Sequence, residues 1–487
     1  MATATIQKRL GSFYTPPSVA RTLVRWVVRQ PSDKLLDPSC GDGRFLEAHR
    51  NSVGVDCDID SVVAATKRSG HATVHAAGFF DWASASRERF DCVAGNPPFI
   101  RYQHFAGAER DNAFRLCSRL GVRFTALASS WAPFLVVAAT MLKPGGRMAF
   151  VVPAEIGHAP YAAPLLTFLM RHFSRVQLVA IKEKLFPGLS EDVWILYADG
   201  FQNTTDHILL SRQERFADGQ ASPPKDARQI SLKDLDDWQG RIRPFLMPDG
   251  VRNLYAEFRN SDYALRLGSV AKVGIGYVSG ANDFFHFRPS EAKRLGVPNR
   301  YLIPTVRNGR CLPSERLTQK IVDGWLHRDE PVLLLRLPKH GPLPKAIYDY
   351  LDSPEGHLAR AGYKCRNRSP WYAVPDVRVP DAFLSYMIGE NSQLVANDAK
   401  CSCTNSVHGV SMAEGFSVDD LLKMWRHPVV ALSCEVEGHP LGGGMLKIEP
   451  GEAARIAIPR EGTHWRRGDL DMIREGIAAM RTWRHYA

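Results

Sequence analysis

The sequence lacks the features that place a protein in a membrane or outside the cell. None of its apolar runs reaches the length of about 18 residues that spans a bilayer. The most apolar stretch, from Pro133 to Leu142, is shorter and leads into Lys-Pro-Gly-Gly. Residues 1–17 contain no apolar core followed by a small-residue cleavage site, so we expect no secretion signal. These absences predict a cytoplasmic protein that has no membrane partner.

Cysteine is present, but not in an arrangement that indicates a disulfide framework or a structural metal. The nine cysteines are odd in number, and the absence of any CxxC pair argues against a zinc ribbon or a thioredoxin-like motif. Cys365, Cys401, Cys403 and His408 could in principle meet around a metal ion. Free cysteines in a reducing compartment pack as small apolar side chains instead. We therefore predict no metal site.

Internal repeats and low-complexity tracts are also absent, and the overall composition is that of an ordinary globular protein. The 487 residues are 45% hydrophobic and 23% charged, which excludes collagen-like, disordered and mini-protein classes. The length suits two large domains or three average ones. The net charge of +11 is unevenly spread, since residues 293–380 hold 16 Lys and Arg against 8 Asp and Glu. That excess fits either a phosphate-contacting face or a solvated surface.

The first 200 residues alternate short apolar runs with helical stretches. The pattern predicts a helix over 133–142, ended by Pro-Gly-Gly, and strands over 34–37, 52–56, 90–95, 147–152, 176–181 and 193–197. Such alternation is typical of an α/β fold with a mostly parallel sheet and helices on both faces.

The character of the sequence changes after this region. Residues 202–245 or thereabouts are polar and contain a Pro-Pro pair, which predicts a linker or an exposed excursion. Beyond them, Gly- and Pro-punctuated short runs predominate, with few long helices apart from roughly 417–426 and 468–484. We therefore predict a first domain over 1–245, including the excursion, and a second, mixed α+β domain over 246–487.

A glycine-rich turn after the first predicted strand has the character of a nucleotide site. The segment LLDPSCGDGRFL, residues 35–46, passes from a strand through two glycines into a helix whose N–H groups would face a ligand. Asp56 closes the second strand, where a carboxylate can accept hydrogen bonds from both hydroxyls of a ribose. The third glycine of the dinucleotide fingerprint is missing and the spacing to the acid is shorter, so NAD fits poorly. A small adenosine ligand without a pyrophosphate fits better.

A second motif, Asn96-Pro97-Pro98-Phe99, follows the third predicted strand. Consecutive prolines remove two N–H donors and stiffen the turn. The Asn side-chain oxygen and a Pro carbonyl would offer two acceptors to a planar NH2 group, and Phe99 offers a ring for stacking a flat base. Accepting both hydrogens of an aromatic amine favours the pyramidal form that attacks an electrophile. The alternative is an ordinary Asn-Pro turn beside a core Phe.

Taken in order, these motifs resemble those of a known enzyme family. The sequence contains FYTPP at 13–17, DPSCGDGRFL at 37–46, VGVD at 53–56, GNPPFIRYQ at 95–103 and LKPGGRMAFVVP at 142–153. The series resembles the gamma-class DNA adenine-N6 methyltransferases of type II restriction–modification systems, over about residues 11–199. The resemblance implies a Rossmann-like S-adenosylmethionine-dependent methyltransferase domain, followed by a target-recognition domain that binds double-stranded DNA. It also implies a target adenine swung out of the duplex.

The resemblance implies a role for each matching residue. Tyr14 and Thr15 would close over the methionine end of the cofactor. Asn96 and the Pro97 carbonyl would bind the adenine amino group, and Phe99 would stack on its ring. A second stacking ring is expected in the stretch KLFPGLSEDVWILY, where we choose Phe186, whose alternative is a core position near a sheet edge. The other cofactor-binding positions that the resemblance implies are Asp37, Cys40, Gly41, Gly43, Asp56 (holding the ribose) and Phe79.

One position departs from the family pattern. The family generally has Asp ahead of a Phe-Phe or Phe-Leu pair in its third motif, where it accepts from the adenine amino group of the cofactor. This sequence has Gly78 there, in the run AGFFDW at 77–82. The departure puts the adenine contact in doubt, and Asp81 lies three residues further along.

The C-terminal half resembles the family only in outline. VGIGYVSGANDFF at 273–285 is similar to the start of target-recognition domains, and LGGGMLKIEPGEAARIAIP at 441–459 is similar to the segment that closes them. Basic residues interleaved with aromatics between these segments suit phosphate clamping and base-edge contact, with a solvated basic loop as the alternative. The residues expected to bind DNA are Arg307, Arg310, Lys364, Arg366 and Arg368. The polar segment 101–121 could be a loop that folds over DNA.

The sequence thus predicts a site-specific DNA methyltransferase acting on the N6 amino group of adenine, which a separate restriction endonuclease could accompany. Two alternatives stay open. One is an amino-group methyltransferase acting on RNA or on protein glutamine. Such enzymes rarely carry about 240 residues beyond the sheet, as this chain does, which argues against this alternative. The other is a catalytically inert DNA-specificity protein; the intact NPPF and glycine motifs argue against it, and Gly78 argues mildly for it.

Overall fold

The computed structural model describes residues 14–186 and 191–486, which fall into two compact units. Unit 1 contains the described residues up to Leu246, together with Leu441–Gly443 and Thr482–His485. Unit 2 contains Met247–Pro440, Gly444–Arg481 and Tyr486. Phe13, part of the first sequence motif, lies outside the described residues, as do residues 187–190 in the stretch that follows Phe186.

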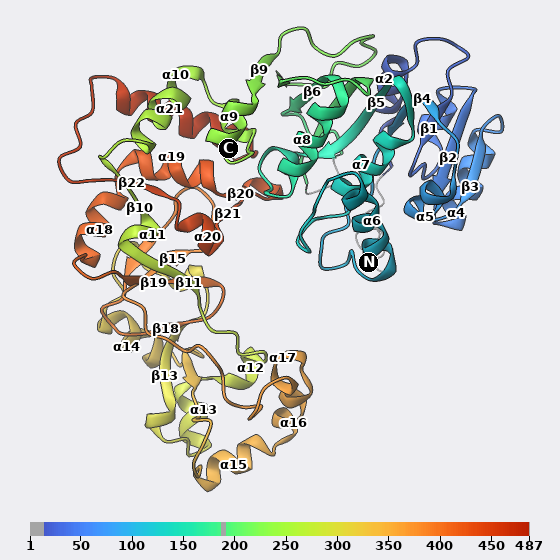
Figure 1. Ribbon diagram of the computed structural model, residues 1–487. Helices are drawn as coiled ribbons and strands as arrows, with labels where there is room; N and C mark the ends of the chain where they lie inside the picture. Colours follow the sequence, from blue (N-terminus) through green and yellow to red (C-terminus); the bar gives the residue numbers. More distant parts are fainter. Residues whose placement is uncertain (1–13, 187–190, 487) are drawn as a thin grey trace. The chain divides into compact units, whose positions relative to one another are not determined.

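Unit 1 is built on a nine-stranded sheet with the strand order β3-β2-β1-β4-β5-β7-β6-β8-β9 (Figure 1). The strands are β1 (Leu35–Asp37), β2 (Ser52–Asp56), β3 (Thr73–Ala76), β4 (Phe90–Gly95), β5 (Leu142–Pro153), β6 (Phe173–Ile181), β7 (Val193–Phe201), β8 (His207–Gln213) and β9 (Arg228–Ser231). The first five strands of this order pair in parallel, whereas β7 is antiparallel to β5 and β6. The chain runs outward from β1 to β3 and then returns to β4 on the other side of β1. The turns after β1 and β4 therefore lie where the strand order reverses, the place where α/β sheets bind ligands.

Helices cover both faces of this sheet. The helix α2 (Pro17–Val27) begins with a proline at its first turn and buries an apolar stripe that joins one core cluster with Ala149 and Val151 of β5. Because side chains alternate along a strand, the buried Phe150 and Val152 face the opposite side. The helix α7 (Trp131–Thr140) is apolar nearly all round and packs on β5 without joining that cluster. No helix in the described part of the chain has the length and apolar character needed to cross a bilayer.

The structure confirms the strands expected from the apolar runs and corrects three other expectations. Residues 202–245 are not a linker: β8 pairs in parallel with β6, β9 pairs with β8, and α9 (Leu232–Asp237) follows. The segment 101–121 is largely the helix α6 (Gly107–Arg119) and not a loop. The helix expected to stop at Pro-Gly-Gly ends earlier, at Thr140, and Pro144-Gly145-Gly146 lies within β5. Strand β3 escaped notice because its four residues are half-buried or exposed and form no apolar run.

Unit 2 is a mixed α+β structure built on two small four-stranded sheets. One has the order β11-β19-β15-β17 and is antiparallel throughout; the other has the order β12-β14-β13-β18. Their strands are β11 (Ala271–Ile275), β19 (Val407–Met412), β15 (Ala382–Ser385), β17 (Leu394–Ala396), β12 (His286–Phe287), β14 (Leu333–Leu335), β13 (Leu302–Val306) and β18 (Ser402–Cys403). The helices expected near 417–426 and 468–484 are confirmed as α18 (Val418–Trp425) and α21 (Asp469–Thr482).

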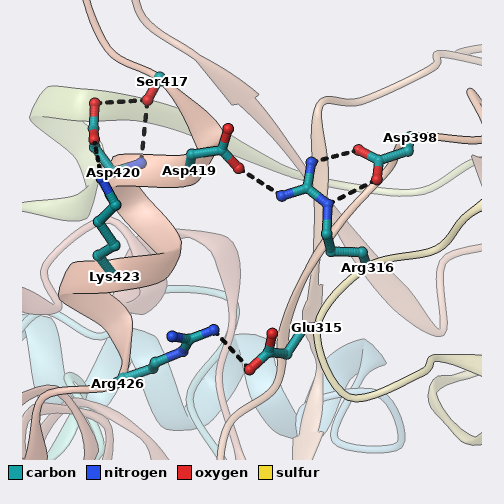
Figure 2. Close-up of polar contacts among 8 residues, drawn as sticks. All are labelled: Glu315, Arg316, Asp398, Ser417, Asp419, Asp420, Lys423 and Arg426. Carbon is teal, nitrogen blue, oxygen red and sulfur yellow. Dashed lines mark hydrogen bonds and ion pairs between the residues drawn. The ribbon is translucent and has the colours of Figure 1, made fainter.

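Ion pairs connect distant segments of unit 2 around Arg316 (Figure 2). The Arg316 guanidinium donates in a bidentate manner to Asp398, at 2.8 Å to each carboxylate oxygen, and also to Asp419 in the first turn of α18 at 2.5 Å. Its neighbour Glu315 accepts from Arg426 at 2.7 Å. In this part of unit 2, arginines are matched by acids, which is the usual arrangement for a structural surface.

Candidate active site

The glycine loop is fixed against the end of β2 by backbone hydrogen bonds. Gly41 and Gly43 have φ of +48° and +84°, a left-handed conformation that favours glycine. The Gly41 N–H donates to Asp56 Oδ2 at 2.8 Å, and the Cys40 N–H donates to the Val55 carbonyl at 3.0 Å. A Cβ on Gly43 would lie 2.9 Å from Ala65 Cα. The loop therefore packs too closely on its neighbours to accept a side chain at this position.

The two carboxyl groups at the ends of β1 and β2 occupy different environments. Asp56 is half-buried, and burial raises its pKa, partly offset by hydrogen bonds from the N–H groups of Asp58 and Gly41. Asp37 is completely buried, and desolvation raises its pKa well above the usual range, with a further contribution from Asp56. Asp37 Oδ1 accepts from the Ser39 N–H at 3.2 Å, whereas Oδ2 has no hydrogen-bond partner among the described residues. A buried oxygen of this kind marks a place that a ligand donor would satisfy.

The residues before α2 lie over the glycine loop. The exposed Tyr14 ring is close enough to the loop that a Cβ on Gly41 would lie 3.5 Å from Tyr14 Cε1. The Arg44 guanidinium lies over the same ring, 5.5 Å from its centroid, and donates to the Thr15 carbonyl at 2.8 Å. Arg44 thus holds both predicted residues against the loop, a role that the sequence motifs did not indicate.

The Asn96-Pro97-Pro98-Phe99 turn is bonded directly to the glycine loop. Asn96 follows β4, which pairs with β1, and the Ser39 hydroxyl donates to the Asn96 backbone carbonyl at 2.9 Å. The side-chain oxygen of Asn96 is buried. A Cβ on Gly95 would lie only 2.8 Å from Asp37 Oδ1, so the turn and the end of β1 are in close contact. The structure therefore brings together the two motifs that the sequence separates by more than fifty residues.

Ser130 fixes the other side of this turn, and sequence reasoning missed it. The Ser130 hydroxyl donates to the Pro98 carbonyl at 2.5 Å and accepts from the Ile100 N–H at 3.0 Å. The Ser130 N–H donates in turn to the Ile100 carbonyl at 3.0 Å. Ser130 is 1% exposed and directly precedes α7. A Ser-Ser pair before an apolar helix is a common capping signal, so the sequence contained no specific indication of this contact.

The aromatic residues expected to stack on a base lie in one apolar cluster. Phe186 is 8% exposed and belongs to the core cluster that contains α2, and the half-buried Phe99 packs against the same cluster. The cofactor-binding residue proposed at Phe79 is also buried and packs on Phe134, with ring centroids 4.5 Å apart. The stacking roles of Phe99 and Phe186 stay predictions.

The structure shows which group lies near the missing third-motif acid. Gly78 is the residue before α5 (Phe79–Ala85), and a Cβ on it would lie 3.9 Å from Asp81 Oδ2. Asp81 folds back over the start of its own helix and accepts from the Asn112 amide of α6 at 2.5 Å. A carboxylate is therefore present close to the position that Gly78 leaves without a side chain.

The basic residues predicted to bind DNA differ in their surroundings within unit 2. Lys364 and Arg366 are exposed and lie over the Tyr363 ring, and Arg310 is exposed as well. Arg307 is half-buried, and its carbonyl accepts from Thr404. Arg368 is half-buried and donates to the Val278 carbonyl at 2.7 Å, and desolvation lowers its pKa. The geometry therefore gives Arg368 a structural contact, and DNA contact by these five residues stays a prediction.

The residues considered for a metal site do not gather around a common point. Within residues 14–186 and 191–486, no group of three or more His, Cys, Asp or Glu side chains is placed to hold a metal ion. His408 Nε2 lies 2.7 Å from the Ile448 carbonyl, and Cys365 Sγ contacts the Ser279 carbonyl.

Comparisons with known proteins match most of the chain. Three family models match: N-6 DNA Methylase over residues 1–59, Eco57I restriction-modification methylase over 54–186, and Type II methyltransferase M.Eco57I, C-terminal domain, over 240–484. The type II methyltransferase M.AccI of Acinetobacter calcoaceticus is 19% identical over 92% of this chain and 84% of its own length. M.XamI of Xanthomonas campestris pv. amaranthicola is 22% identical over 93% of this chain and 85% of its own length.

A solved structure shares the fold. The type IIL restriction-modification enzyme MmeI, in complex with DNA, is 13% identical and matches 91% of this chain with a TM-score of 0.50; this chain spans 61% of the MmeI chain. The M.Eco57I C-terminal model alone matches just over half of the sequence. With the N-6 DNA methylase motifs joined in unit 1, the chain belongs to the type II, N6-adenine DNA methyltransferases of restriction–modification systems.

Proposed function

We propose that this protein transfers a methyl group from S-adenosylmethionine to the N6 amino group of an adenine swung out of duplex DNA. In this proposal it is the modification component of a restriction–modification system, and unit 2 recognises the DNA site. Unit 1 carries the chemistry. Swinging the base out costs a few kcal/mol, which stacking on Phe99 and Phe186 would help to offset.

Several features of unit 1 fit a bound S-adenosylmethionine. Gly41 has no side chain, and the Tyr14 ring, expected to close over the methionine end of the cofactor, lies at van der Waals distance from the position that a Cβ would occupy. The carboxylate of Asp56 retains lone pairs for ribose hydroxyls beside those engaged by backbone N–H groups. Asp37 Oδ2 is a buried acceptor without a partner among the described residues. Asp81, beside Gly78, would accept from the adenine amino group of the cofactor.

The protein's contribution to methyl transfer is positioning. S-adenosylmethionine, when bound, supplies an electrophilic methyl group on a sulfonium. The Asn96 side-chain oxygen and the Pro97 carbonyl would accept the two amino hydrogens of the target adenine, which orients the nitrogen lone pair toward that methyl group. No covalent enzyme intermediate is needed, and Cys40 fits that view because burial raises the pKa of its thiol.

The observation that carries this proposal is the hydrogen bond from the Ser39 hydroxyl to the Asn96 carbonyl. It ties the acceptor turn to the glycine loop, so an amine held by Asn96 would lie beside a cofactor held by Gly41 and Asp56. An Asn-Pro turn with no role in transfer would not need to contact a nucleotide-type loop.

The test is transfer of a radiolabelled methyl group from S-adenosylmethionine to three acceptors: duplex DNA lacking adenine methylation, RNA and protein. Label in DNA as N6-methyladenine, abolished in Asn96→Ala, is the expected result. Label in RNA or protein but not in DNA would contradict the proposal. Intact cofactor binding with no transfer to any acceptor would favour an inert specificity protein. Sequencing of the methylated DNA then identifies the recognition site.

A further inference from the structure

A basic cavity of unit 2 lies within the basic region 293–380 but is not lined by the five residues predicted to bind DNA. It has a volume of about 600 Å3 and is lined by the residues that flank β13 and β14, together with residues 373–378. Strands β13 and β14 are antiparallel neighbours, and the Arg336 N–H donates to the Tyr301 carbonyl at 2.8 Å just beyond their pairing. This places Arg300 and Arg336 at adjacent strand ends. We refer to the cavity as the Arg300 groove.

The charges that line the Arg300 groove are nearly all positive. Arg300, Arg336, Lys339 and Arg378 line it, all four are exposed, and Asp376 is the one acidic residue among its lining residues. Asp376 lies 4.0 Å from Arg378, and both side chains are more than 70% exposed, so this pair contributes little. Within the described part of the chain, no carboxylate forms an ion pair with Arg300, Arg336 or Lys339.

Several arginines elsewhere in unit 2 are instead paired with acids. Arg316 binds two aspartates and Arg426 binds a glutamate (Figure 2), and Arg328 binds Glu330. Cations gathered in a concave surface without acids repel one another and raise the local positive potential. A polyanion removes that repulsion and releases its own counterions on binding. The groove is therefore complementary to phosphates.

One cation of the groove packs against an aromatic ring. The Arg300 guanidinium lies over the Tyr301 ring, 4.9 Å from the centroid. The buried Leu337, Ala373 and Val374 form an apolar base beneath the charged side chains. An arginine that packs over a ring loses less conformational entropy when it binds a ligand than a free surface lysine does.

We propose that the Arg300 groove clamps backbone phosphates of duplex DNA and supplies sequence-independent affinity to unit 2. The inference rests on the proposed function, because a DNA methyltransferase must hold its duplex while a base leaves the stack. The expected phosphate contacts are then the four cations of the groove, which folding brings together. Arg368 is not among them, because its guanidinium donates to the Val278 carbonyl.

The test compares two double variants of the full chain that remove the same charge. Arg300→Gln/Arg336→Gln neutralises the groove, and Lys320→Gln/Arg360→Gln neutralises two exposed cations of unit 2 that do not line it. Binding of a fluorescein-labelled duplex of about 30 base pairs and arbitrary sequence is followed by anisotropy from about 50 to 200 mM salt. The slope of log K against log salt is expected to fall by about 2 in the groove variant, with affinity reduced about ten- to hundredfold at 100 mM salt. The control variant is expected to keep a slope near that of the wild type.

Each other outcome has a definite meaning. Equal slopes in the groove variant and the wild type, or equal losses in the groove variant and the control, would overturn the inference while leaving the proposed function intact. A wild-type protein that binds no duplex would overturn both. Arg300→Lys/Arg336→Lys keeps the charge and should keep the slope. Should the Gln double variant fail to fold, Lys339→Gln/Arg378→Gln tests the same prediction with two exposed side chains.

Discussion

Replacing Ser130 by Ala isolates the contribution of turn rigidity to methyl transfer. The substitution removes only the hydroxyl, which donates to the Pro98 carbonyl and accepts from the Ile100 N–H. At 1% exposure, no water can replace it without local opening. Leaving one donor and one acceptor unsatisfied costs about 1–3 kcal/mol each. Because Pro98 and Ile100 are only half-buried, we expect a loss near the lower end, about 2–3 kcal/mol in the free energy of unfolding.

The larger effect is expected in catalysis. A turn that shifts by about 1 Å misplaces the two acceptors for the adenine amine, which costs about tenfold to a hundredfold in the rate of the chemical step. Cofactor binding should change little, because Ser130 contacts the turn and not the glycine loop. The assay is single-turnover methyl transfer at saturating cofactor and DNA, alongside cofactor affinity by calorimetry and stability by urea unfolding.

A matched control is Ser52→Ala, which removes another buried serine hydroxyl of unit 1 that makes one long bond, 3.4 Å, to the Leu46 carbonyl. It should cost less than about 1 kcal/mol and leave the rate unchanged. A wild-type single-turnover rate in Ser130→Ala would refute the reasoning. So would a parallel loss of rate and cofactor affinity, since Ser130 would then act on the whole pocket and not on the turn.

Three further substitutions test residues of unit 1, and one tests a buried histidine of unit 2. Asn96→Ala should abolish methyl transfer while sparing cofactor binding measured by calorimetry, and normal turnover would contradict the role of Asn96. Phe99→Ala should lower the transfer rate less, because Phe186 can still stack on the base. Gly95→Ala places a Cβ 2.8 Å from Asp37 Oδ1 and should lower the free energy of unfolding in urea by about 1–3 kcal/mol, with methyl transfer impaired. A variant as stable as the wild type would mean that Asp37 moves freely. His286 is buried, and desolvation lowers its pKa to about 4, so the unfolded chain binds its proton more readily than the folded one. The stability that this neutral histidine contributes is complete above pH 6.5 and should fall by up to about 3 kcal/mol as pH drops toward 4. The free energy of urea unfolding should therefore differ less between pH 7 and pH 5 in His286→Gln than in the wild type. An equal difference in the two proteins would exclude this histidine as the cause.

The His286 prediction has a clear structural basis. His286 Nε2 lies 2.7 Å from the Tyr277 hydroxyl, which also lies 2.8 Å from Thr305 Oγ1, and all three side chains are buried. His286 Nδ1 has no hydrogen-bond partner among the described residues. Arg307 also contributes to lowering the His286 pKa, so protonation would add a charge beside an existing cation. The neutral ring is the form that this core accommodates.

Local sequence pattern predicted the candidate site residues that lie within a few residues of a strand end. Asp56 and Asn96 were predicted because each lies at the end of a short apolar run, and Asp37, which the family resemblance implied, lies at the end of another; such runs form parallel strands whose carboxyl ends share one edge. Since β1 pairs with both β2 and β4, the motifs after these strands meet without any help from distant segments. Local pattern was sufficient for the glycine loop and for the acceptor turn.

Contacts between segments far apart in the chain could not be predicted from local pattern. Ser130 meets the acceptor turn because α7 packs on β5, and the predicted helix did not indicate which turn the residue before it would contact. Residues 207–213 lie in a stretch that is polar as a whole, yet they become β8 because β6 offers an open edge whose backbone groups need partners. The Arg300 groove joins three segments that hold no common motif. Local pattern specifies which backbone conformation a segment prefers, whereas pairing and burial between distant segments depend on the whole fold.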